Sequence, residues 1–186
     1  SPDTQTNWNG ITGRIELQCF GEKYLDNVMI FPNVSDKTLR ITADLIGGDN
    51  ASVSVSADSF NGDVKHHPEP MAFEITSSKL DCIYPMGDDC LLWSEHYPNL
   101  YYLRLDIDGD VYEQVIGMRD FSQKDGKFTI NGKNTFLRGK HDGMIFPMTG
   151  FAPTDVEGWL RVMKTAKEFG INHYRFHTCC PPEAAF

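Results

Sequence analysis

The stretch that decides the fold reads NTFLRGKHDGMIFPMTGFAPTDVEGWLRVMKTAKEFGINHYRFH, residues 134–177. Its apolar and polar residues predict a short strand over residues 134–140, a helix over 154–169 and a second strand over 171–177. Residues 181–186 are predicted to begin another helix. A strand, a helix and a second strand joined by a short return loop are typical of a parallel crossover unit. We therefore expect one and a half β/α units of a larger fold here.

The predicted helix carries start and stop signals. Thr154, followed three residues later by Glu157, predicts a capping box. Gly170 predicts the C-terminal stop. Apolar residues recur at helical spacing and are expected to form one buried face, with Ala166 between them. These residues are Val156, Trp159, Leu160, Met163 and Phe169.

Residues 10–117 show a different period. Apolar and polar residues alternate in runs separated by Gly, Pro, Asn and Asp, which is typical of an antiparallel β-sandwich. The alternating apolar residues are Ile15, Leu17 and Cys19; Val28 and Ile30; Leu39, Ile41, Ala43 and Leu45; Val53 and Val55; Phe73 and Ile75; Leu103, Leu105 and Ile107; and a run over residues 111–115. We count seven or eight strands, an immunoglobulin-like size. Asn131-Gly132 then predicts a hairpin between residues 128–130 and 133–136.

Composition narrows the possible partners. The chain has 186 residues, 40% of them hydrophobic, and a net charge of −9 without a basic patch. Nucleic acid and anionic membranes are therefore excluded as expected partners. No apolar run approaches the ~20 residues that span a bilayer. The five cysteines are irregularly spaced and are expected to be free thiols, with no metal site and no cofactor.

The candidate site lies where the two predicted parallel strands end, since ligands bind at the C-terminal ends of such strands. Strand parity places Arg175 and His177 on one face, and Tyr174 and Phe176 on the face beneath the helix. A buried arginine needs a carboxylate or a ligand beside it. Arg175 is therefore either a ligand-site residue or half of a structural ion pair, and His177 is either a ligand contact or a capping or core histidine.

Several segments resemble, in order and spacing, the glycoside hydrolase family 2 enzymes, the β-galactosidase and β-glucuronidase group. The segments are NWNGITG (residues 7–13), LWSEHYPNLY (92–101), GMR (117–119), FTINGKNTFLRG (128–139) and MKTAKEFGINHYRFH (163–177), followed by Pro181-Pro182. The resemblance implies that residues 1–11 end an N-terminal jelly-roll sugar-binding domain. Residues 12–119 would form the immunoglobulin-like β-sandwich, and residues 120–186 the start of a (β/α)8 TIM barrel that is truncated here.

The resemblance also implies roles for particular residues. Family members use two glutamates, on barrel strands four and seven, so no catalytic residue is expected in this chain. Arg175 matches the arginine beside the nucleophile, and His177 matches a histidine that binds the sugar. The loop after the first strand departs from the Asn-Arg-His-Glu run of β-galactosidases, because it reads His141-Asp142-Gly143-Met144. His141 and Asp142 are expected either to contact sugar or to support the loop.

The resemblance implies a fragment of an enzyme that hydrolyses O-glycosidic bonds of a carbohydrate substrate, β-galactosidase-like and with a retaining mechanism. The alternatives are a non-catalytic carbohydrate-binding or spacer module, and a β-sandwich interaction domain without a sugar. The compartment stays open, and a secreted or periplasmic location fits the resemblance. The truncated barrel segment is expected to be held by association, either with another copy in a homo-oligomer or with its own sandwich.

Overall fold

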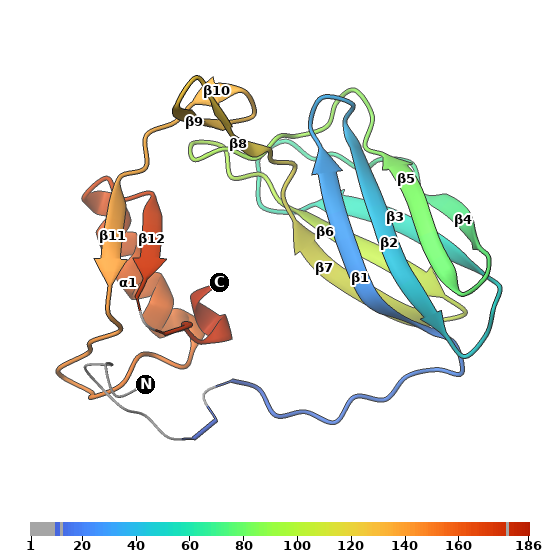
Figure 1. Ribbon diagram of the computed structural model, residues 1–186, viewed down its shortest axis with the longest axis horizontal. Coiled ribbons are helices and arrows are strands. Elements are labelled where there is room, and N and C mark those ends of the chain that lie inside the picture. Colours follow the sequence, from blue (N-terminus) through green and yellow to red (C-terminus); the bar gives the residue numbers. More distant parts are fainter. Residues whose placement is uncertain (1–9, 12, 178) are drawn as a thin grey trace. The chain divides into compact units, whose positions relative to one another are not determined.

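The computed structural model describes residues 10–11, 13–177 and 179–186 (Figure 1). The chain forms two compact units, one comprising residues 18–135 and the other residues 1–17 together with 136–186. Most of the expected jelly-roll end at residues 1–11 lies outside the described residues. The unit boundary at residue 135 differs from the expected domain boundary at residue 119, because a small three-stranded sheet groups with the sandwich.

Residues 18–135 contain a β-sandwich of two antiparallel sheets (Figure 1). The first sheet has the order β1-β2-β5, with β1 (Tyr24–Asn33), β2 (Thr38–Ile46) and β5 (Lys79–Pro85). The second has the order β4-β3-β6-β7, with β4 (Met71–Ile75), β3 (Ala51–Ser59), β6 (Tyr101–Ile107) and β7 (Asp110–Ile116). The seven strands confirm the predicted antiparallel sandwich, while its immunoglobulin-like classification stays a prediction.

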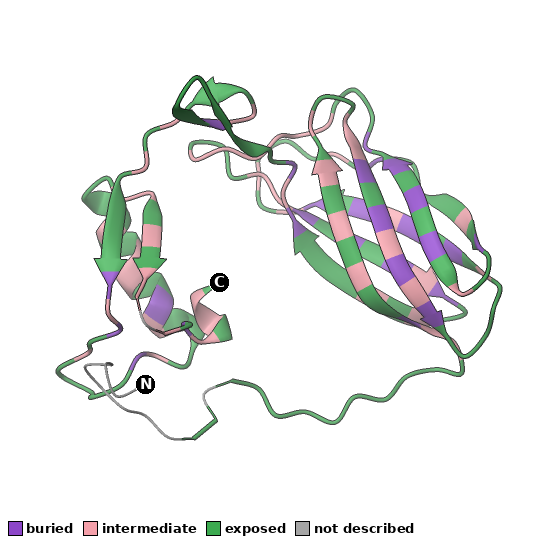
Figure 2. Cartoon of the chain, in the orientation of Figure 1, coloured by how far each residue is buried: buried purple, intermediate pink, exposed green. Residues whose placement is uncertain are grey.

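The core of the sandwich is built from the predicted alternation. Along β2, Leu39, Ile41, Ala43 and Leu45 are all buried, while the residues between them are exposed or half-buried (Figure 2). Strands β3 and β6 show the same period-two burial, since successive side chains of a strand point to opposite faces. The two inward faces therefore pack into one continuous core.

Two strand assignments in this region need correction. Ile15, Leu17 and Cys19 alternate like a strand, but residues 14–21 form no strand and Leu17 is 92% exposed. No strand among the described residues pairs with this segment, and alternation without a neighbouring strand does not make a strand. Conversely, β5 was missed, although Leu80, Cys82 and Tyr84 are buried in strict alternation.

The Asn131-Gly132 hairpin is confirmed. Three short strands, β8 (Phe121–Lys124), β9 (Lys127–Ile130) and β10 (Lys133–Asn134), form an antiparallel sheet in the order β10-β9-β8. Asn131 and Gly132 have φ values of 51° and 73°, which are the left-handed conformations that a type I′ turn requires. The strand expected over residues 134–140 is wrong in its bounds, because β10 ends at Asn134 and the next strand begins at Gly139.

Residues 136–186 contain β11 (Gly139–Asp142), helix α1 (Val156–Glu168), β12 (His173–Phe176) and the 3-10 turn η1 (Glu183–Ala185). Strands β11 and β12 pair in parallel, which confirms the strand–helix–strand crossover (Figure 1). Their sheet has two strands among the described residues, so the (β/α)8 barrel stays a prediction. Among the residues that the structure describes, no helix is long and apolar enough to cross a membrane.

The ends of α1 partly match expectation. The helix is capped by Asp155, whose carboxylate accepts a hydrogen bond from the backbone N–H of Gly158 at 2.8 Å, and not by Thr154. Asp is a stronger N-cap than Thr, and here it occupies the position directly before the helix. At the other end Gly170 has a φ of 78°, and its N–H donates to the carbonyl of Lys167, as in a Schellman stop.

The buried face of α1 is narrower than predicted. Trp159 is 1% exposed and packs edge-to-face against Phe146 and Phe176. Leu160 is 48% and Phe169 83% exposed, although both belong to the predicted apolar face. Two strands present only a narrow surface beneath a helix, so that in the described structure the flanks of α1 face solvent.

Candidate functional site

The candidate site is the C-terminal end of the β11–β12 pair. The parallel register places His141 directly beside Arg175. His177 follows β12 by one residue, and its backbone N–H donates to the carbonyl of Asp142 at 2.9 Å, which continues the strand pairing. The imidazole rings of His141 and His177 lie with their centroids 4.7 Å apart. Period-two alternation therefore brings His141, Arg175 and His177 together on one face.

This face is basic. The guanidinium of Arg175 is exposed and has no ion-pair partner among the described residues. None of the residues that share the face along β11 and β12 is acidic. The described residues contain no cluster of His, Cys, Asp and Glu that could hold a metal ion. Chemically, such a face can bind a carboxylate or the hydroxyl groups of a polar ligand.

Asp142 lies on the opposite face. Its side chain is 6% exposed, accepts a hydrogen bond from the backbone N–H of Met144 at 2.8 Å and pairs with Lys140 at 2.5 Å. It is next to His141 in sequence, and adjacent residues of a strand point in opposite directions. The carboxylate therefore does not lie with the three basic side chains but contacts Lys140 and the loop residue Met144.

Several polar side chains lie near Asp142, on the face of the strands opposite His141. The ammonium of Lys140 lies 5.1 Å from the ring centroid of Tyr174, within cation–π range. The hydroxyl of Tyr174 is buried, and it has no hydrogen-bond partner among the described residues. Burial raises the pKa of this tyrosine, and the charge of Lys140 acts in the opposite direction. Burial likewise raises the pKa of the Cys179 thiol, which donates to the carbonyl of His177 at 3.3 Å.

Asn172, for which the sequence analysis made no prediction, is a structural residue. Its side-chain oxygen accepts from the N–H of Arg138 at 2.8 Å, and its amide donates to the carbonyl of Phe136 at 3.1 Å. Its own backbone N–H donates to the carbonyl of Arg138. Asn172 thus ties the start of β12 to the segment before β11, and an amide directly after Gly170-Ile171 was the available signal.

Comparisons with known proteins place the chain in a family. The model of the family described as "Glycosyl hydrolases family 2" matches residues 23–119, just over half of the chain. A putative β-glucuronidase of Formosa agariphila is 27% identical over 177 residues, covering 90% of this chain and 21% of the relative. A β-galactosidase of Kluyveromyces lactis is 24% identical over 180 residues, covering 93% of this chain and 16% of the relative.

Solved structures agree in fold. The apo structure of Bacteroides uniformis β-glucuronidase 3 has a TM-score of 0.63 and 22% identity, covering 88% of this chain and 21% of that chain. The chain therefore spans about a fifth of the length of the relatives it matches. These matches confirm the resemblance of the ordered sequence segments: the chain belongs to glycosyl hydrolases family 2.

Proposed function

We propose that this chain is part of a retaining, β-galactosidase-like glycoside hydrolase, and that His141, Arg175 and His177 contribute to its sugar-binding subsite. The observation that carries the proposal is the gathering of these three basic side chains at the C-terminal ends of paired parallel strands. This is the end at which α/β folds bind their ligands. The relatives carry the names β-glucuronidase and β-galactosidase, which supports a glycoside as the substrate.

In this proposal Arg175 acts through its charge. Retaining hydrolysis requires two carboxyl groups about 5–5.5 Å apart, one as nucleophile and one as acid/base. A guanidinium beside the nucleophile favours its ionised form and lowers its pKa. The face of β11 and β12 supplies the cation, but none of its residues is acidic. Both carboxylates are therefore proposed to come from later barrel strands of the parent enzyme, and residues 1–186 alone are proposed to be inactive.

The histidines would contact the sugar. An imidazole carries a donor and an acceptor in its neutral form, which suits the hydroxyl groups of a sugar ring. His177 is held by its backbone bond to Asp142, and the Asp142 carboxylate is itself held by Lys140. In the proposed site, Asp142 therefore positions the backbone at His177, while His141 and His177 contact the substrate.

The test compares two variants of the full-length protein on nitrophenyl β-galactoside and nitrophenyl β-glucuronide. Arg175→Gln is expected to lower kcat by roughly tenfold or more with a smaller change in KM, because the charge beside the nucleophile is lost. Lys164→Gln, on the exposed surface of α1, is the matched control and should leave both constants unchanged. An unchanged kcat in Arg175→Gln, or turnover by residues 1–186 alone, would contradict the proposal.

A second function, a spacer or carbohydrate-binding module without catalysis, is favoured by one observation. The sandwich in residues 18–135 has a core of its own, so it can serve as a separate module. Retardation of residues 18–135 on gels containing a soluble polysaccharide would support binding. Unchanged migration, together with activity in the full-length protein, would support a spacer.

A further inference from the structure

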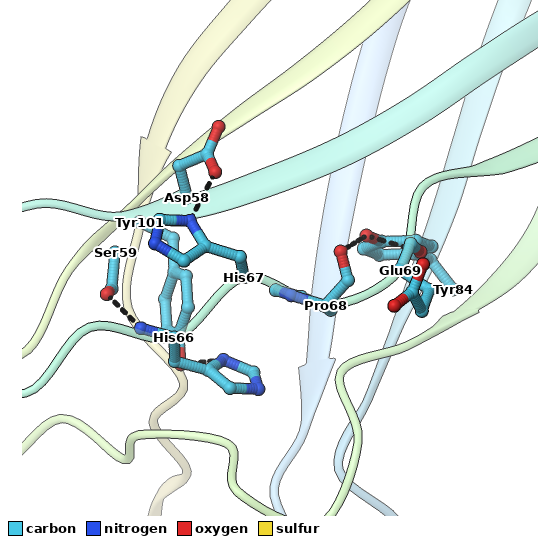
Figure 3. Close-up of polar contacts among 8 residues, drawn as sticks. All are labelled: Asp58, Ser59, His66, His67, Pro68, Glu69, Tyr84 and Tyr101. Carbon is cyan, nitrogen blue, oxygen red and sulfur yellow. Dashed lines mark hydrogen bonds and ion pairs between the residues drawn. The ribbon is translucent and has the colours of Figure 1, made fainter.

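Residues 66–69, between β3 and β4, are held by side chains of the sandwich strands (Figure 3). The backbone N–H of His66 donates to the hydroxyl of Ser59 at 2.7 Å, and the N–H of Ser59 donates to the carbonyl of His66 at 3.1 Å. The imidazole of His67 pairs with the Asp58 carboxylate at 2.6 Å. The Tyr84 hydroxyl donates to the carbonyl of Glu69 at 3.1 Å. The segment is thus a built part of the domain.

The hydroxyl of Tyr101 joins this segment to a second one. It lies 2.9 Å from Nδ1 of His66, and it accepts a hydrogen bond from the backbone N–H of Leu91 at 2.8 Å. The two rings also meet edge-to-face, with centroids 5.7 Å apart (Figure 3). Tyr101 is fully buried at the start of β6, so its position is fixed by the core. This hydroxyl therefore connects His66 with Leu91, while Asn61 joins the same two segments further along, through bonds to the carbonyl of Pro98 and the backbone N–H of Leu100.

The connection depends on where one proton lies. A tyrosine hydroxyl has one hydrogen to donate, and the N–H of Leu91 already occupies part of its acceptor capacity. When His66 is neutral, its Nδ1 can accept the hydrogen of Tyr101. When His66 is protonated, Nδ1 becomes a donor, so the hydroxyl must accept a second bond and turn its hydrogen elsewhere. The neighbouring group in reach is the thiol of Cys90, a weak acceptor.

The surroundings of His66 favour the neutral form. Burial lowers its pKa below the ordinary 6.5, the charge of His67 acts in the same direction and that of Asp89 acts against it. Tyr101 also faces His66, and Cys90 interacts with Tyr101; burial raises the pKa values of both groups, so both stay protonated near neutral pH. A lowered folded-state pKa means that the contact is fully stable above pH 6.5 and weakens as the pH falls below it.

We propose that His66 and Tyr101 form a pH-sensitive clasp, closed when His66 is neutral, which loosens the hold of Tyr101 on Leu91 when His66 is protonated, while the bonds of Asn61 to Pro98 and Leu100 stay in place. Opening of the clasp is expected to affect a further contact, because Leu91 lies two residues before Trp93. The N–H of Trp93 donates to the carbonyl of Met118, and its carbonyl accepts from the side chain of Asn131 at 2.8 Å. Acid therefore loosens the segment on which the β9–β10 hairpin is anchored.

The test is amide hydrogen exchange by NMR at about pH 8 and about pH 5, corrected for the intrinsic exchange rate, on either side of the histidine transition. The amides of Leu91 and His66 are expected to lose about tenfold in protection at the lower pH. The loss should follow the titration of the His66 ring signals in the unaltered chain. If His66 titrates while the protection of Leu91 stays constant, the clasp does not exist.

Two variants sharpen the test. His66→Asn places an amide where Nδ1 lies but cannot be protonated, so the loss of protection at Leu91 should disappear. His96→Asn, at an exposed histidine in the same segment as Leu91, should keep the loss seen in the unaltered chain. If His66→Asn shows the same loss as the unaltered chain, another group is responsible and the proposal fails. The ring titration and exchange of the unaltered chain decide the question even if His66→Asn does not fold.

Discussion

The two compact units differ in how much of their apolar pattern they bury. In residues 18–135, the inward-facing residues of seven strands form one core in which Leu39, Ile41 and Val53 are fully buried. In residues 136–186, the buried core among the described residues consists of Met144, Ala152 and Trp159, and Pro181 is the one other buried apolar residue described there. A sandwich is closed by its two sheets, whereas a strand–helix–strand unit covers one side of a two-stranded sheet. The same kind of pattern therefore stabilises the first unit more than the second.

The largest expected effect is the loss of independent folding in one unit only. Residues 18–135 produced alone should melt cooperatively with a β-type circular dichroism spectrum, because their core is complete. Residues 136–186 produced alone should show no cooperative transition.

The whole chain should self-associate more than a version ending at Arg119, through the exposed strand edges of β11 and β12. If both versions sediment as monomers, the predicted self-association is wrong. A disordered circular dichroism spectrum for residues 18–135 would contradict the prediction that this unit folds alone.

A substitution in the smaller core comes next in size. Trp159→Ala should lower the free energy of unfolding of this unit by about 3–5 kcal/mol, because it removes the largest buried side chain of its core. It should make residues 136–186 susceptible to limited proteolysis while the sandwich stays resistant. Leu160→Ala, one residue further along the same helix and 48% exposed, is the control and should change the cleavage rate little. Equal cleavage of the two variants would mean that Trp159 does not hold this unit together.

A smaller effect is expected where the hairpin meets the sandwich. The side chain of Asn131 accepts from the N–H of Asp120 and donates to the carbonyl of Trp93, both at 2.8 Å. Asn131→Gly keeps the left-handed turn but loses both bonds, and should cost about 1–2 kcal/mol in urea unfolding of residues 18–135. Asn131→Ala should cost more, since alanine is also strained at a φ of 51°.

Asn134→Ala is the control for this pair of variants, because Asn134 lies at the exposed end of the same hairpin. It should leave the urea midpoint almost unchanged. A midpoint for Asn131→Gly equal to that of the unaltered chain would show that the two side-chain bonds contribute nothing to stability. The hairpin would then be held by its turn and backbone pairing alone.

Much of the fold could be predicted from the sequence because its signals are local. Alternation along β2, β3 and β6 identified the core residues, and Asn131-Gly132 identified a type I′ turn that needs two left-handed residues. The same signal misled at Ile15 and Leu17, because an alternating segment becomes a strand only when another strand supplies its hydrogen bonds. It was overlooked along β5, where the alternation is equally clear.

The candidate site divides in the same way. The sequence by itself determined that Arg175 and His177 share a face, because side chains of one strand alternate with a period of two. Only the tertiary structure decided that His141 joins them and that Asp142 does not, because this depends on the register between β11 and β12, which are more than thirty residues apart. Likewise, only the folded sandwich brings His66 to the hydroxyl of Tyr101, thirty-five positions along the chain. Local periodicity is written in neighbouring residues, whereas register and long-range contacts follow from the packing of the whole unit.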